Sequence, residues 1–475
     1  MKSRIIARSS EQKILGDCLN AENSEFVAVY GRRRVGKTFL IKEFFEGQMS
    51  FYVTGLLDKP QEEQIANFNS EIANHGGAGI PIATTWHQAF ENLNALITRK
   101  RTKGKKVLFL DEIPWMDTAG SDFLSALDHF WNRWASTRHD VLLIVCGSAT
   151  SWMKSNLVDN YGGLYNRLTR QIAMQPFTLA ECEQYYQKRH IDMTRYQMLE
   201  AYMVFGGIPY YLSLFDKRNS LYQNIDMLYF RHDAPLENEY RTLFRSLFKR
   251  AENHIRIVEL LAGKGIGLTR MELCALGGFA DGGKLSVLLD DLENNGFIRS
   301  YNAFGKKSRG RIYQLVDPFI LFHLRFSHKR VGRNDSFWMQ YSSTPSHSAW
   351  SGFAFERVCL LHSSQIKQGL GISGVLTEIS AWQSRETDPG VQVDLVIDRN
   401  DRVINLCEAK FSSEEYTISK KMDGNLRNKR AVFKQETKTR KTLQTTLITP
   451  FGLTQNAYAN QITSQLTMDD LFRQP

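Results

Sequence analysis

The chain lacks the features of secreted, membrane-spanning and zinc-finger proteins. Its six cysteines lie far apart and form no CxxC pair, which fits reduced thiols in cores better than zinc ligands or disulfides. No apolar run approaches the length of a membrane span, and the charged start MKSRIIARSSEQK lacks the apolar core of a signal peptide. We therefore expect a soluble, cytoplasmic protein without a membrane partner.

Proline is scarce, with 11 residues, and we find no low-complexity tract and no internal repeat. Together with a hydrophobic content of 42%, this indicates folded material almost throughout the 475 residues. The length is too great for one ordinary core and suggests about three domains. The net charge of +10 is compatible with a nucleic-acid partner, although many basic proteins merely stay soluble in this way.

The stretch GRRRVGKT lies between the apolar run FVAVY and the helix-like FLIKEFFE. This setting is typical of a phosphate-binding loop, because glycines let backbone N–H groups and a helix N-terminus face the phosphates. We expect Lys37 to contact the β- and γ-phosphates of ATP and Thr38 to bind Mg²⁺. The three arginines could face phosphates or solvent. The predicted nucleotide-binding residues of the loop are Gly31, Arg32, Arg33, Arg34, Val35, Gly36, Lys37 and Thr38.

Two acidic residues follow four apolar ones in VLFLDEIPWM, as in a Walker B strand. We expect Asp111 to hold the Mg²⁺ shell and Glu112 to orient and deprotonate the attacking water. The alternative is a strand that ends in acidic residues for capping alone. Another buried-strand pattern, VLLIVCGSAT, ends in Ser148 and Thr150. A polar side chain there could touch the γ-phosphate or the attacking water, or it could belong to an ordinary turn at the strand end.

Arg167 and Arg170 lie three residues apart in YGGLYNRLTRQIAMQPF, so on a helix they would share a face. Either could be an arginine finger, which stabilises the transferring phosphoryl group and often comes from a neighbouring subunit. The alternative for each is a surface salt bridge or a nucleic-acid contact. From Phe177 to about Phe248 the pattern turns helical and predicts a lid, whose aromatic residues have the spacing of a packed core.

The order of GRRRVGKT, VLFLDEIPWM, IVCGSATSWM, LYNRLTRQIAMQPF and FGGIPYYL resembles the prokaryotic AAA-type ATPases usually called the archaeal ATPase family, within the STAND branch of P-loop proteins. The likeness extends to about Arg245. It implies ATP binding and Mg²⁺-dependent hydrolysis. Where that family often has Gly-Arg, this chain has Asn-Arg at Arg167, so the arginine itself is in place.

Residues 254–315 read as three helices and a short hairpin, which looks like a winged helix-turn-helix. The hairpin tip carries Lys306, Lys307, Arg309 and Arg311. The outward face of the third helix is mainly acidic, and carboxylates repel DNA phosphates. A structural role or a weak DNA contact is therefore favoured for this part.

A second constellation lies near the C-terminus. Glu356 is on the helix-like GFAFERVCLLH, Asp394 lies in the strand-like QVDLVID, and LCEAKF carries Glu408 and Lys410 two residues apart. Residues at i and i+2 on a strand share a face. The pattern predicts a site where Asp394 and Glu408 bind Mg²⁺ and Lys410 steadies the attacking hydroxide during phosphodiester cleavage. The alternative is a surface ion pair between Glu408 and Lys410.

This motif resembles the PD-(D/E)xK restriction-endonuclease-like fold, with Val393 in place of the usual proline. The full layout resembles archaeal-family ATPases that carry such a C-terminal domain. A run of basic residues follows the motif. It is either a solvated helix face or a surface that contacts the phosphates of a nucleic acid. It comprises Lys420, Lys421, Arg427, Lys429, Arg430, Lys434, Lys438, Arg440 and Lys441.

These observations predict an α/β multidomain protein. The expected parts are a P-loop AAA-type core at 1–176, a helical lid at 177–248, a winged helix-turn-helix at 249–335 and a restriction-endonuclease-like domain at 345–475. The expected function is ATP hydrolysis coupled to a nuclease-like domain that acts on nucleic acid, DNA more than RNA. An arginine finger would imply a homo-oligomer. The alternative is a STAND-like switch whose C-terminal domain binds a partner or nucleic acid without cleaving it.

Overall fold

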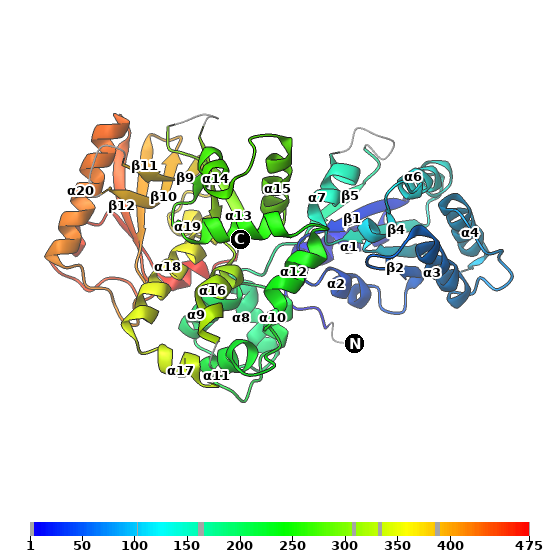
Figure 1. Ribbon diagram of the computed structural model, residues 1–475, viewed down its shortest axis with the longest axis horizontal. Helices are drawn as coiled ribbons and strands as arrows, with labels where there is room; N and C mark the ends of the chain where they lie inside the picture. The colour runs from blue at the N-terminus through cyan, green and yellow to red at the C-terminus, as the bar shows by residue number, and fades with distance from the viewer. Residues whose placement is uncertain are drawn as a thin grey trace. The chain divides into compact units, whose positions relative to one another are not determined.

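The computed structural model describes residues 4–101, 103–159, 166–305, 310–330, 335–384 and 390–474. The chain divides into two compact units, Met1–Gln175 and Pro176–Pro475 (Figure 1). Across the described residues, no helix combines the length and apolar character that crossing a bilayer requires.

Unit 1 is built on a five-stranded sheet with the order β2-β3-β4-β1-β5, in which every pairing is parallel. Each residue of β1, β3 and β4 is buried, because a parallel sheet covered on both faces requires continuous apolar runs. The predicted α/β fold with a parallel sheet is confirmed. The strands are β1 (Glu25–Tyr30), β2 (Met49–Thr54), β3 (Lys106–Asp111), β4 (Val141–Gly147) and β5 (Arg170–Ala173).

The helices of unit 1 enclose this sheet. Phe68 of α3, Phe90 of α4 and Phe130 of α6 join one large apolar core with Phe26, Phe51 and other strand residues. Figure 1 shows α3, α4 and α6 gathered on one side of the unit. The helices are α1 (Ser9–Asn20), α2 (Lys37–Phe44), α3 (Gln61–Asn74), α4 (Trp86–Arg99), α5 (Ile113–Met116), α6 (Phe123–Arg133) and α7 (Thr150–Met153).

The strand order decides which loops meet. Because β4 lies between β1 and β3, the segments that follow these three strands emerge at the same carboxyl edge of the sheet. The loop after β1 is GRRRVGKT, Asp111 ends β3, and Ser148 follows β4. The fold therefore assembles three of the predicted motifs at one edge.

The expectation that Arg167 and Arg170 share a helix face is wrong. Arg170 begins β5, and Arg167 lies in the preceding turn with its side chain exposed. The stretch from Arg170 to Ala173 pairs in parallel with β1, and Thr169 N–H donates to Phe26 O at 2.8 Å. Pairing with the open edge of β1 outweighs the local helical tendency, so the two arginines take different places.

Unit 2 begins with a helical region. Thr178, Thr194 and Ser220 each start a helix through a capping box, in which the hydroxyl accepts from a backbone N–H and a Glu or Gln side chain reaches back. The polar residue before each helical run therefore fixes its start. The helices are α8 (Leu179–Lys188), α9 (Arg195–Phe205), α10 (Pro209–Ser213), α11 (Leu221–Ile225) and α12 (Glu239–Leu247).

The middle of unit 2 contains three helices and a small antiparallel sheet with the order β6-β8-β7. Leu285, Leu289 and Leu292 of the third helix are buried, as their spacing predicts. Lys306, Lys307 and Arg309 lie outside the described residues, and Arg311 is exposed at the start of β8. The elements are α13 (Glu252–Ala262), β6 (Leu268–Thr269), α14 (Arg270–Gly277), α15 (Gly283–Asn294), β7 (Ile298–Asn302) and β8 (Arg311–Leu315).

The last part of unit 2 is a five-stranded sheet with the order β13-β12-β11-β10-β9, antiparallel from β9 to β11 and parallel from β11 to β13. Its strands are β9 (Thr377–Gln383), β10 (Gln392–Arg399), β11 (Val403–Ala409), β12 (Thr442–Ile448) and β13 (Ser464–Leu466). Phe433 of α20 (Lys420–Thr437) packs into the core that these strands form. Figure 1 shows α20 running beside β11 and β12.

Further helices complete unit 2. One of them, α18, contacts β11, and another, α21, contacts both α9 and α19. These helices are α16 (Pro318–Phe326), α17 (Phe337–Tyr341), α18 (Pro345–Leu361), α19 (Ser363–Gly369) and α21 (Met468–Leu471).

Glu200 of α9 makes the stability of unit 2 depend on pH. Its side chain is buried, and burial raises the pKa of this carboxyl from its ordinary 4.5 to about 7, although Tyr222 donates a hydrogen bond to it at 3.0 Å. Between these two values the folded chain binds more protons than the unfolded chain. Its free energy of unfolding therefore falls as the pH rises through this window.

We predict that Glu200→Gln removes the fall in the free energy of unfolding at rising pH, because an amide stays neutral at every pH. At pH 8 the variant should be more stable than wild type by at most about 3 kcal/mol, and the advantage should shrink toward pH 4.5. Urea unfolding at several pH values measures the difference. Glu414→Gln, at an exposed position of the same unit, serves as the control. An equal gain at all pH values would contradict the prediction.

Candidate functional site

The backbone of the phosphate-binding loop depends on two glycines. Gly31 has φ of 146°, and a Cβ there would lie 2.2 Å from the carbonyl oxygen of Met174. Gly36, the residue before α2, has φ of 90°, in the region that side chains disfavour. Arg34 also has a positive φ of 76°, a strain of the kind found at ligand sites. The loop shape therefore follows from its sequence.

Lys37 points into this loop. Its side chain is buried, and Nζ donates to Gly31 O at 2.8 Å, to Arg32 O at 3.0 Å and to Ser148 Oγ at 3.1 Å. An ammonium group has three donors, and all three are used here. The positive charge is thus fixed at the centre of the loop and next to the end of β4.

Thr38 and Asp111 face each other across the carboxyl edge. The Thr38 hydroxyl lies 2.9 Å from Oδ2 and 3.2 Å from Oδ1 of Asp111. Burial raises the pKa of Asp111, the charge of Glu112 adds to this, and the hydrogen bond from Thr38 opposes it. Hydroxyl and carboxylate oxygens suit Mg²⁺, and a cation here would offset the buried charge. These two residues therefore fit the predicted ion.

Glu112 is held by the residue that follows β4. Ser148 N–H donates to Glu112 Oε2 at 2.9 Å, and the Ser148 hydroxyl donates to Oε1. Glu112 itself adopts the left-handed conformation, with φ of 50°. Ser148 thus joins Lys37 to Glu112. The sequence left open whether Ser148 only ends the strand in an ordinary turn. Its contacts with both Lys37 and Glu112 go beyond such a turn.

The arginines of the phosphate-binding loop and the arginine-finger candidate Arg167 differ in their exposure to solvent. Arg32 is buried with 4% exposure, so its side chain does not face solvent. Arg33 and Arg34 are half-buried. Arg167 is exposed, and Val35 is buried within the loop.

Arg8 supports the loop and was missed by the sequence analysis. Its buried guanidinium donates to Val35 O at 3.2 Å and to Gln175 O at 2.7 Å, and it pairs with Glu11 at 3.3 Å. Arg8 adopts a positive φ of 60° directly before α1. The nearby sequence resembles an ordinary charged terminus, so no signal there indicated a buried role.

The structure also brings the four C-terminal residues together. Continuing the antiparallel register from Leu395 opposite Cys407 by one residue places Asp394 opposite Glu408. Burial raises the pKa of Glu356 to about 7, with Asp394 and Glu408 raising it further and Arg357 and Lys410 lowering it. Glu356 comes from α18 and Lys429 from α20, so two helices join β10 and β11 in supplying this carboxylate–lysine cluster. The cluster comprises Glu356, Asp394, Glu408, Lys410 and Lys429.

Two lysines hold Glu408 in this cluster. Lys410 Nζ lies 2.7 Å from Oε1 and Lys429 Nζ lies 2.7 Å from Oε2. Burial alone would favour the neutral acid, but the two lysines hold the pKa of Glu408 below its ordinary value. Asp394 Oδ1 accepts a hydrogen bond from the Gln392 side chain. The sequence left open a surface ion pair between Glu408 and Lys410; the two side chains are paired, but the Glu408 side chain is only 11% exposed.

This arrangement does not fit a bound divalent ion. Within the parts of the chain that the structure describes, no group of three or more His, Cys, Asp or Glu side chains is arranged to hold a metal. Both oxygens of Glu408 already contact ammonium groups. The Mg²⁺ site predicted at Asp394 and Glu408 thus stays a prediction, and we derive no cleavage step through a metal there.

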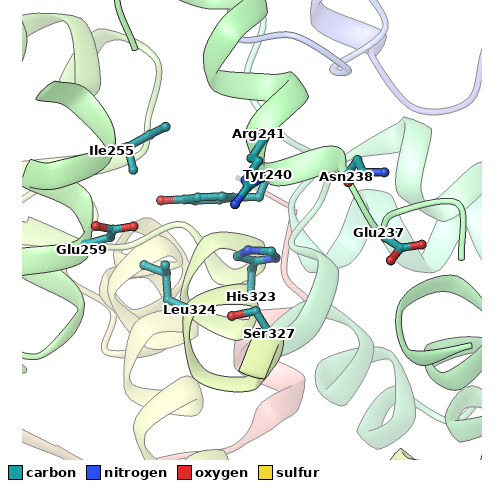
Figure 2. Close-up of a pocket in the computed structure, with 9 residues that line it drawn as sticks. All are labelled: Glu237, Asn238, Tyr240, Arg241, Ile255, Glu259, His323, Leu324 and Ser327. Atoms are coloured by element: carbon teal, nitrogen blue, oxygen red, sulfur yellow. The ribbon is translucent and has the colours of Figure 1, made fainter. Parts of the chain in front are cut away.

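A separate cavity lies in unit 2, between α12, α13 and α16 (Figure 2). Its volume is about 440 Å³, and it is lined by charged and aromatic side chains. The rings of Tyr240 and His323 stack with centroids 4.4 Å apart, and the buried Tyr240 hydroxyl has no hydrogen-bond partner among the described residues. None of the predicted site residues lines this cavity.

The parallel sheet, the glycine-dependent loop and the Lys37–Ser148–Glu112 network together define a P-loop ATPase domain. Residues 6–215 match the family described as an ATPase domain predominantly from Archaea. The chain therefore carries an archaeal-type ATPase domain.

The chain is also similar to two further proteins, one in sequence and one in structure. An uncharacterized protein of Methanocaldococcus jannaschii is 23% identical over 411 residues, which cover 86% of this chain and 87% of that protein. A Walker-type ATPase of Pyrococcus abyssi is 18% identical, with a TM-score of 0.50 over 68% of this chain and 97% of that chain. This structural likeness shows the fold alone.

We predict that Arg8→Met destabilises unit 1 by about 1–3 kcal/mol, because it leaves the buried carbonyl group of Val35 and the carbonyl group of Gln175 without their donor. Arg4→Met is the matched control, since the Arg4 side chain is 76% exposed and its pair with Glu43 spans 3.8 Å. The control should cost less than about 0.5 kcal/mol. Urea unfolding followed by a probe in unit 1 measures both. Equal losses would contradict the role of Arg8.

Proposed function

We propose that this protein hydrolyses ATP at the carboxyl edge of the unit 1 sheet, and that its nucleotide state governs a nucleic-acid-directed, nuclease-like C-terminal domain. The observation that carries the proposal is the network of Lys37, Ser148 and Glu112, which links the phosphate-binding loop to the predicted general base. The archaeal-type ATPase domain supports the first half of the proposal.

The residues of unit 1 divide the work of hydrolysis. Lys37 turns a donor from a loop carbonyl to a phosphate oxygen, and the loop N–H groups cradle the remaining oxygens. Thr38 and Asp111 would hold Mg²⁺, which supplies neutralisation of phosphate charge when bound. Glu112, oriented by the two donors of Ser148, accepts a proton from the attacking water. Exposed Arg167 would act in a neighbouring copy, which implies a homo-oligomer.

Lys37→Ala should weaken ATP binding by at least about tenfold, because a charge-assisted contact to the phosphates is lost. Lys42→Ala is the matched control, since Lys42 is exposed on the same helix and its ammonium lies over the Tyr52 ring. Titration calorimetry with ATP and Mg²⁺ measures both variants. Unchanged affinity in Lys37→Ala would remove the nucleotide site from this loop.

Glu112→Gln should bind ATP as wild type does and lose about a hundredfold in turnover, because an amide cannot take the proton of water. Phosphate release under saturating ATP measures the rate. Wild-type turnover no faster than that of Glu112→Gln would contradict the hydrolytic role.

The second half of the proposal rests on α20 and the cluster beside it. The exposed face of α20 carries cations, and a polyanion such as DNA is the partner that such a face suits. The carboxylate–lysine cluster contains the residue types that phosphodiester cleavage uses. We favour DNA over RNA, with the cluster next to the bound strand.

The binding of lysines to Glu408 favours a second candidate function, a STAND-like switch. In this case hydrolysis resets a conformation, and the C-terminal domain binds nucleic acid or a protein without cutting. The ion pairs at 2.7 Å support it, because they satisfy Glu408 without any metal.

Plasmid cutting in Mn²⁺, with and without ATP, separates the two functions. A nuclease should cut, and Asp394→Asn should abolish cutting, because it removes a carboxylate charge from the cluster. Asp401→Asn, in the exposed turn after β10, should leave cutting unchanged. Intact plasmid with wild-type protein under every nucleotide condition would favour the switch.

A further inference from the structure

One residue of the cavity between α12, α13 and α16 lacks a hydrogen bond. The Tyr240 side chain is only 5% exposed, and its hydroxyl has no partner among the described residues. A buried polar group without a partner costs free energy. The hydroxyl end of this side chain points toward the part of the cavity where Ile255 and Glu259 lie (Figure 2). A ligand in the cavity can supply the missing hydrogen bond.

The Tyr240 ring is held in place by its neighbours. It stacks on the His323 ring with centroids 4.4 Å apart and planes 13° apart, and it packs against Phe244 with centroids 5.1 Å apart. The Tyr229 hydroxyl lies 2.9 Å from Nδ1 of His323 and so fixes the second ring of the stack. A rotation of the Tyr240 side chain would break these contacts. The hydroxyl therefore stays directed at the cavity.

Two side chains of opposite charge also line the cavity. Arg241 follows Tyr240 on α12, and Glu259 lies on α13 one helical turn after Ile255. Both charged side chains are exposed, and within the part of the chain that the structure describes they form an ion pair neither with each other nor with a third residue. Charged groups bind most strongly to groups of the opposite charge. An arginine and a glutamate that face one cavity therefore favour a ligand with both a carboxylate and an ammonium group.

The surroundings of Tyr240 indicate where the ammonium group lies. Burial raises the pKa of Tyr240, and the charge of Glu259 raises it further, so the hydroxyl stays neutral and close to that carboxylate. An ammonium group beside Glu259 can donate to this hydroxyl as well. The other carboxylate of the cavity, Glu237, lies at the opposite end (Figure 2). The end near Glu259 is therefore the better place for the ammonium group.

The size and the apolar walls of the cavity restrict the ligand further. The volume of about 440 Å³ falls within the range of small-molecule sites, roughly 300–1,000 Å³. Ile255 and Leu324 add apolar surface to the lining. A ligand with an apolar side chain can remove this surface from water.

We propose that this cavity binds a small zwitterion with an apolar side chain, of the kind that free α-amino acids provide. Arg241 binds the carboxylate, and Glu259 binds the ammonium group. The Tyr240 hydroxyl accepts a hydrogen bond from the same ammonium group, and the apolar side chain lies against Ile255 and Leu324. None of these residues belongs to the nucleotide site or to the carboxylate–lysine cluster. The inference thus goes beyond the proposed function and does not depend on it.

Titration of the full-length chain with phenylalanine and with leucine, followed by ligand-observed NMR, tests the proposal. Phenylalanine methyl ester lacks the carboxylate charge, and N-acetylphenylalanine lacks the ammonium charge. Each should bind at least about tenfold more weakly than phenylalanine, because one charge-assisted contact is lost. Binding of either derivative as tight as that of phenylalanine would indicate a site for a single charge and would overturn the zwitterion. Failure of both amino acids to bind at millimolar concentration would also overturn it.

Substitutions on α12 and α13 locate the binding. Arg241→Met and Glu259→Gln should each weaken phenylalanine binding by about tenfold. Arg245→Met and Glu252→Gln are the matched controls, because they remove the same charges from exposed positions of the same two helices outside the cavity lining. Both controls should keep the wild-type affinity. Wild-type affinity in both cavity variants would place the ligand elsewhere and overturn the assignment.

Tyr240→Phe distinguishes a contact with the ligand from a role in packing. The hydroxyl has no partner among the described residues, so its removal should not lower the urea concentration at which the chain unfolds. The same variant should bind phenylalanine severalfold more weakly than wild type. An earlier unfolding transition together with unchanged affinity would show that the hydroxyl serves the fold alone, and it would overturn this part of the proposal.

Discussion

The position of β4 between β1 and β3 is the constraint on which the nucleotide site depends. It inserts Ser148 between the phosphate-binding loop and the acidic end of β3, where one side chain can contact both. Without this strand order, Lys37 and Glu112 would have no common partner, and Glu112 would lie next to the buried Asp111 without the two Ser148 donors. The sheet topology thus determines the chemistry at its edge.

The C-terminal cluster follows a different electrostatic logic. At the unit 1 site, burial raises the pKa of Asp111, so a bound cation would stabilise its charged form. At Glu408, the ammonium groups of Lys410 and Lys429 already stabilise the charged form. Buried charges require partners, and a protein can provide them from a metal or from its own side chains. The Thr38–Asp111 pair fits the first solution, and Glu408 with its two lysines shows the second.

The sequence predicted which motifs meet at the carboxyl edge of the unit 1 sheet, because their residues lie close together in the chain or end continuous apolar strands. GRRRVGKT, Asp111 and Glu112 could be placed from local pattern alone. Arg8 could not, because its contacts with Val35 and Gln175 join parts that are distant in sequence. Arg170 was misplaced because its conformation depends on pairing with β1. Lys429 was recognised only as one of many cations, although it lies three residues after the buried Leu426 and four before the buried Phe433, the spacing of one helix face.

The contact between Gly31 and the carbonyl of Met174 joins the loop to the segment that follows β5. A side chain at this glycine would push that segment away from β1, and the edge strand would lose its register along with the loop. The close approach of Gly31 to the Met174 carbonyl therefore matters both for the shape of the phosphate-binding loop and for the pairing of β5 with β1. A substitution at Gly31 would disturb the loop and the sheet edge together. It would therefore not be a suitable variant for studying the protein without nucleotide.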